Sequence, residues 1–106
     1  MLAAALAALA TLVAWPAAAA DAAAGRLRAQ QTCAVCHGPL GVATAPETPN
    51  LAGEPAGYLA RQLKAFRSGA RQHEVMAVIA RQLGDADIHN VAAWFSSIRV
   101  EARAPD

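Results

Sequence analysis

Apolar positions in the second half of the chain recur every three or four residues, the spacing of amphipathic helices. One such face lies within residues 54–68 and comprises Tyr58, Leu59, Gln62, Leu63 and Phe66. A second face lies within residues 85–98 and comprises Ile88, Val91, Ala92, Phe95 and Ile98, with Trp94 just outside it. Two helices that each bury one side are therefore predicted.

Residues 21–31 also predict a helix, although their pattern is less regular. Asp21 is suited to the N-cap, and the alanines that follow are strong helix formers. Gly25 lies inside this helix, where glycine costs about 1 kcal/mol relative to alanine. A glycine at such a position indicates that another element passes close by.

Proline and glycine mark the remaining boundaries. Pro55 fits the first turn of the helix that carries the first face, and Gly69 ends that helix. A short helix is predicted over residues 75–83, with Gly84 as its C-cap and Asp85 as the cap of the last helix. No stretch alternates in the manner of a strand, so we expect an all-α domain of about four short helices.

The first twenty residues differ from the rest of the chain. Residues 1–20 are rich in alanine and carry no charged side chain, and Pro16 interrupts them. The small residues from Ala18 to Ala20 fit a signal-peptidase site. We expect a secretory signal that is cleaved after Ala20, leaving one domain at 21–106 in the periplasm. An uncleaved membrane anchor is the alternative.

Composition narrows the possible functions. The net charge is +1, so nothing points to nucleic acid as a partner. A domain of this size has little apolar surface to bury and often needs a cofactor or a cross-link. Aromatic residues make up 5% of the chain, which increases that need.

Cys33, Cys36 and His37 form a C-x-x-C-H segment, the spacing at which haem c is attached. Each thiol can add to one vinyl group, and the histidine is then placed to ligate the iron. A dithiol redox pair would need a βαβ setting, and a zinc site would need further ligands. A disulfide closing so small a ring would add little stability. We therefore expect one haem c, covalently bound through Cys33 and Cys36.

An iron that is held by one histidine has a second axial position, for which His73, Met76 and His89 compete. Met76 is the only methionine once a signal is removed, and it lies where a connector becomes a helix. Thioether ligation raises the reduction potential, whereas a second histidine would lower it. We expect both histidines to be solvated and Met76 to be the ligand. The alternative is that Met76 fills the core.

A series of segments extends over nearly the whole domain: 33–38, 49–53, 58–69, 76–83 and 85–95. With this series the chain resembles a class I cytochrome c of the small bacterial periplasmic kind, and especially one half of the dihaem c-four type. The resemblance implies His37 and Met76 as axial ligands, with the Pro49 carbonyl accepting the His37 Nδ1–H. It also implies that the first and last helices cross at Gly25, with Trp94 packed there. The dihaem relatives carry a second motif, and this chain carries one.

The expected function is one-electron transfer with redox partner proteins, either a reductase or a terminal oxidase or dehydrogenase. With both axial positions filled, no catalysis at the iron is expected. One alternative is a haem subunit docked permanently on a dehydrogenase or oxidase. Another is a ligand-binding or peroxidatic haem protein whose Met76 bond is labile. Membrane association is expected only if the first twenty residues are retained.

Overall fold

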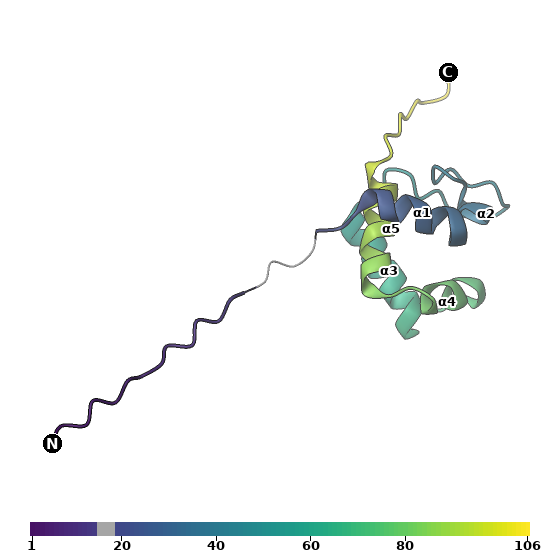
Figure 1. Cartoon of the computed structure of the whole chain (residues 1–106). Coiled ribbons are helices and arrows are strands. Elements are labelled where there is room, and N and C mark those ends of the chain that lie inside the picture. The colour runs from purple at the N-terminus through teal and green to yellow at the C-terminus, as the bar shows by residue number, and fades with distance from the viewer. Residues whose placement is uncertain (15–18) are drawn as a thin grey trace.

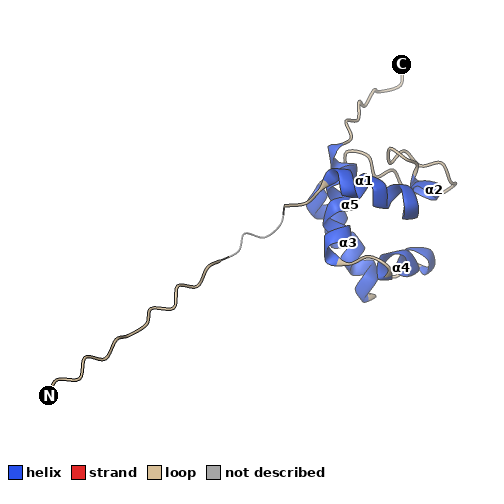
Figure 2. Cartoon of the chain, viewed as in Figure 1, coloured by secondary structure: helices blue, strands red, loops and turns tan. Residues whose placement is uncertain are grey.

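The computed structural model of the chain describes residues 1–14 and 19–106. These residues contain no strand and five helices (Figures 1 and 2): α1 (Ala22–Thr32), α2 (Ala34–His37), α3 (Ala56–Ser68), α4 (Glu74–Arg81) and α5 (Asp85–Ser97). The all-α class is confirmed, and the helix beyond the four expected is α2, which is a single turn.

The N-terminal segment lies apart from the helices. Residues 1–14 carry no regular structure and lead away from the helical domain in Figure 1. Pro16 and Ala18 of the predicted signal lie outside the described residues. None of the described helices is long and apolar enough to cross a membrane.

Helices α1 and α5 cross at Gly25. A Cβ atom at this position would lie 1.9 Å from the carbonyl oxygen of Asn90, so a side chain there would force the helices apart. The Asn90 side chain strengthens the crossing, because its Oδ1 accepts the backbone N–H of Asp21 at 2.8 Å. The predicted close approach is thus confirmed. Trp94, which was expected at the crossing, packs partly buried against the core cluster that includes Ala29.

The core is built largely on α5. The buried face predicted for this helix is confirmed at Ile88, Val91, Ala92 and Phe95, of which Phe95 and Ile88 are the largest fully buried side chains. Helix α5 packs against both α1 and α3, and α3 in turn packs against α4. Burying each large apolar side chain contributes roughly 1.5–3 kcal/mol, so α5 is the element on which the other helices depend.

Two predicted helix boundaries are confirmed. Asp21 is the N-cap of α1, and its carboxylate accepts the backbone N–H of Ala24 at 3.0 Å. Helix α3 ends at Gly69, which adopts the left-handed conformation typical of a residue that follows a helix.

The junction between α4 and α5 differs from the prediction. Gln82 is the C-cap of α4, and Gly84 is the N-cap of α5. The carboxylate of Asp87 accepts the Gly84 N–H at 3.1 Å and so performs the capping role predicted for Asp85. An acidic side chain three residues inside a helix reaches back to the N-cap amide more readily than one at the first position. Asp85 instead pairs with Arg67 of α3.

Candidate functional site

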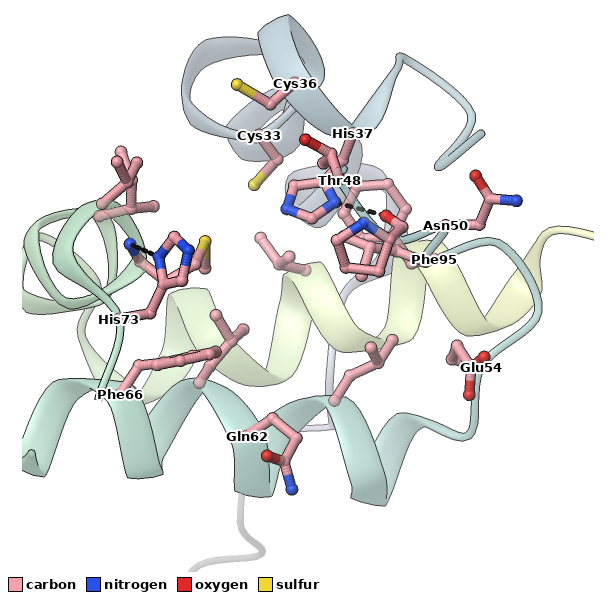
Figure 3. A pocket seen from close by; sticks show the side chains of 18 of the residues that line it. Cys33, Cys36, His37, Thr48, Asn50, Glu54, Gln62, Phe66, His73 and Phe95 are labelled. Carbon is pink, nitrogen blue, oxygen red and sulfur yellow. Dashed lines mark hydrogen bonds between the residues drawn. The ribbon is translucent and has the colours of Figure 1, made fainter. Parts of the chain in front are cut away.

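A cavity of about 760 Å³ lies between α2, α3, α4 and the loop that follows α2 (Figure 3). Its volume is in the range of sites that hold small molecules and cofactors. The helical face predicted over residues 54–68 lines one wall, with Tyr58, Leu59, Gln62, Leu63 and Phe66 all at the cavity. The face of α3 therefore serves the cavity as well as the core.

His37 is the one polar side chain that is buried within the described part of the chain, with 9% of its surface exposed. Its Nδ1 lies 2.8 Å from the carbonyl oxygen of Pro49. Because a carbonyl can only accept, Nδ1 carries the proton and Nε2 keeps its lone pair. In Figure 3 the ring stands at the cavity wall below the two cysteines. This is the tautomer and setting that a metal-ligating histidine requires.

The loop between His37 and α3 holds the Pro49 carbonyl through backbone hydrogen bonds. Two successive loop N–H groups donate to the Cys36 carbonyl at 3.0 and 3.2 Å. Two others, just after Pro49, donate to the Gly41 carbonyl at 2.7 and 3.0 Å. Hydrogen bonds before and after Pro49 thus hold its carbonyl, which accepts the His37 N–H, close to the segment that carries His37.

Gly38 makes this loop possible. Its φ of +79° and ψ of 154° are open only to glycine, and a Cβ there would lie 2.0 Å from the Val42 carbonyl oxygen. Further along, the Asn50 side-chain oxygen accepts the Ala43 N–H at 2.8 Å. The asparagine that follows Pro49 therefore fixes the return of the loop, a role that the sequence did not reveal.

Cys33 and Cys36 line the cavity, and both are half-buried. Cys33 immediately precedes the single turn of α2 and Cys36 lies within it, so both cysteines reach the cavity that His37 also lines (Figure 3). Burial raises the pKa of the Cys33 thiol, although a hydrogen bond with Thr32 and the charge of Arg28 act in the opposite direction. Before haem is attached, the Cys33 thiol is therefore neutral at pH 7.

Met76 reaches the same cavity from the first turn of α4 and is half-buried. The structure thus places around one cavity every residue that the sequence analysis assigned to the site: Cys33, Cys36, His37, Pro49 and Met76. They come from three parts of the chain, namely the α2 segment, the loop and α4.

The other two histidines lie in different surroundings. His73 is exposed, as expected, but it also lines the cavity and is the N-cap of α4. Its Nδ1 accepts the Met76 N–H at 3.1 Å. The sequence analysis missed this role because histidine is not one of the residues that signal an N-cap. His89 is exposed on α5, with its Nε2 3.3 Å from the Nζ of Lys64.

Comparison with known proteins shows the family to which this chain is related. The profile described as cytochrome c oxidase, cbb3-type, subunit III matches residues 20–95. The chain belongs to the cytochrome c family. Cytochrome c-554(548) of Halomonas halodenitrificans is 44% identical over 80 residues, which cover 73% of this chain and 95% of the relative.

Two further relatives of this cytochrome are longer proteins. Cytochrome c4 of Pseudomonas aeruginosa is 37% identical over 84% of this chain, which spans 44% of that relative. The solved cytochrome c4 of Acidithiobacillus ferrooxidans has a TM-score of 0.70 and 34% identity, covering 76% of this chain and 51% of the other. The cytochrome c chain therefore matches about half the length of these c4 relatives, and the predicted likeness to one half of that type is confirmed.

The residues at the cavity fit the cofactor of this family. Members of the family carry haem c through a cysteine pair, and Cys33 and Cys36 are that pair here. The cavity offers the remaining requirements: an imidazole nitrogen with a free lone pair, a thioether, and walls made mainly of apolar side chains. The cytochrome thus carries haem c as the centre of its domain.

Proposed function

We propose that this cytochrome is a periplasmic one-electron carrier whose haem iron is bound by Nε2 of His37 and by the sulfur of Met76. One observation carries the proposal: the imidazole of His37, oriented by Pro49, and the side chain of Met76 line the same cavity as the cysteine pair. The haem supplies the redox chemistry, and the chain sets its potential and its exposure to partners.

The chain's own residues have separate tasks in this function. The Pro49 carbonyl fixes the orientation of His37 and increases its basicity. The Met76 thioether favours ferrous iron and so raises the potential. If His37 and Met76 both bound the iron, no site would remain open for a substrate, which supports a carrier and not an enzyme.

Export and covalent attachment belong together in this proposal. Residues 1–20 act as the secretory signal, with cleavage after Ala20, and the domain at 21–106 operates in the periplasm. The expected mass of the purified protein is that of residues 21–106 with one haem. A mass that includes Met1 would show that the segment is retained.

A second candidate function is that of a haem subunit docked on a dehydrogenase. Two kinds of relatives favour it. A protein of Stutzerimonas stutzeri named thiosulfate dehydrogenase electron acceptor is 39% identical over 62% of this chain and 32% of the relative. The solved thiosulfate dehydrogenase (TsdBA) from Marichromatium purpuratum has a TM-score of 0.66 and 35% identity over 78% of this chain and 20% of that chain. Co-elution with a stable partner from native extract would support docking, and a lone monomer would support the carrier.

The ligand assignment is tested by replacing Met76 with alanine. We expect the haem to stay attached, the ferric protein to bind cyanide readily, and the potential to fall by on the order of 0.1–0.2 V, a part of the range that axial ligands span. The weak long-wavelength band of ferric iron bound to sulfur should be present in the parent protein and absent in the variant. His89→Ala is the matched control. A parent protein that lacks the band and binds cyanide freely would instead indicate the ligand-binding or peroxidatic alternative.

A further inference from the structure

Helix α4 carries Met76 and is anchored to its neighbours by side chains at its C-terminal end. Arg28 of α1 donates to the carbonyl oxygen of Gln82 at 3.0 Å. Arg67 of α3 donates to the next carbonyl, that of Leu83, at 3.1 Å. The first bond satisfies a carbonyl that the end of a helix leaves without an internal partner, and the second holds the residue that follows the C-cap.

The N-terminal end of α4 depends on His73. This residue is extended, with φ −158° and ψ 129°, and its Nδ1 accepts the N–H of Met76 at 3.1 Å. The amides of the first turn have no partner within the helix. The hydrogen bond that His73 accepts therefore fixes the first turn of α4. Its donor is the backbone N–H of Met76 itself.

The ring of His73 is in turn located by α3. It meets the ring of Phe66 edge to face, with 6.3 Å between centroids and an angle of 72°. The guanidinium of Arg71 lies 4.5 Å from the Phe66 centroid, and Arg71 also donates to the Gln62 side-chain oxygen at 2.8 Å. Phe66 is 8% exposed, so the side chain against which the His73 ring packs is itself buried.

We propose that His73 is a positioning residue that keeps the Met76 sulfur at the iron by holding the first turn of α4. The proposal rests on the function given above, in which Met76 is the axial ligand. A thioether is uncharged and ends a flexible side chain, so its place depends on the backbone that carries it. Without the cap, the first turn frays, the sulfur leaves the iron more often, and an added ligand competes more easily.

Three variants of His73 separate this role from simple packing. His73→Ala removes both the ring and the acceptor, and His73→Phe keeps the aromatic edge but lacks an acceptor. His73→Asn keeps an acceptor of the kind preferred at N-caps. We expect cyanide affinity of the ferric protein to rise about 2- to 30-fold in the first two variants, the span that corresponds to losing an N-cap. The asparagine variant should stay close to the parent protein.

The measurements are cyanide titration, the sulfur absorption band and the midpoint potential, all on the intact haem protein. His89→Ala serves as control, since it removes an exposed imidazole from α5. If His73→Ala binds cyanide like the parent while the sulfur band persists, the positioning role is wrong and the proposed function stands. If His73→Phe alone resembles the parent, packing explains the effect and the proposal is also wrong. A parent protein without the sulfur band would overturn the Met76 assignment and this proposal together.

Discussion

The two sides of the cavity are built in different ways. On the His37 side, main-chain hydrogen bonds of the loop fix the Pro49 carbonyl, and Gly38 supplies a conformation that other residues lack. On the Met76 side, α4 is held largely through side chains, among them His73. A ligand fixed by backbone geometry tolerates substitution of its neighbours, whereas one fixed by side chains can be adjusted by single changes. If His37 and Met76 bind the iron as proposed, the first side would fix the haem and the second would tune its potential.

We expect the largest effect on haem retention and stability from removing the two cysteines that attach the haem, because both sides of the cavity depend on it. Replacing Cys33 and Cys36 with alanine should abolish covalent haem and destabilise the domain, because the helices surround a cavity that would be left without its cofactor. Extraction with acidified organic solvent and circular dichroism measure the two losses. Haem that resists extraction from this double variant would show that attachment occurs elsewhere.

The His37 side is tested by Gly38→Ala. The added Cβ meets the Val42 carbonyl in a conformation closed to alanine, so we expect a loss of about 3 kcal/mol or more in the free energy of unfolding. Gly57→Ala is the control, since a Cβ there meets only the end of the Arg61 side chain at 3.4 Å. Within α3 that change should stabilise by up to about 1 kcal/mol. Urea denaturation compares the two, and equal effects would show that the loop is less constrained than the structure indicates.

The Met76 side is tested at the other end of α4 by Arg67→Met. This change removes the hydrogen bond to the Leu83 carbonyl and the ion pair with Asp85 but keeps much of the side chain's length. We expect a loss of about 1 kcal/mol in stability together with a modest rise in cyanide affinity. The environment of His37, followed by its NMR signals in the ferrous protein, should not change. A change confined to the His37 signals would contradict the division between the two sides.

The smallest effect is expected from Asp85→Asn, which removes only the ion pair. The hydrogen bond and charge of Arg67 hold the pKa of the Asp85 carboxyl below its usual range. A lowered pKa in the folded state stabilises the fold above the unfolded value of about 3.9, and this contribution is lost as the pH falls through the folded value. The parent protein should thus exceed the variant slightly in stability at pH 7, and the difference should vanish in acid. A difference that grows on acidification would contradict this assignment.

The sequence predicted those parts of the fold that depend on local pattern. The face of α5 and the N-cap at Asp21 were readable because periodicity and capping act over a few residues. The close approach at Gly25 was readable because glycine is costly inside a helix. The sequence did not reveal the role of Gly84, because a glycine between two helices can end the first or begin the second. Only the structure shows that Gly84 begins α5, because its N–H donates to the carboxylate of Asp87.

The same distinction holds for the site. The C-x-x-C-H spacing indicated haem without any structure, because attachment and ligation are set within one helical turn. The link from Phe66 through His73 to Met76 joins α3 to α4 by the direction of side chains, which sequence spacing does not reveal. Asn50 was missed for a similar reason, as its partner Ala43 lies across the loop.

The crossing at Gly25 also constrains the order in which the domain can fold. Its partner is the backbone at Asn90, and the backbone nitrogen of Asp21 donates to the side chain of that same residue, so this contact forms only when nearly the entire chain is available. The cysteine pair emerges more than fifty residues earlier than Asn90. The C-x-x-C-H segment is therefore synthesised well before α5, the helix whose arrival completes the crossing.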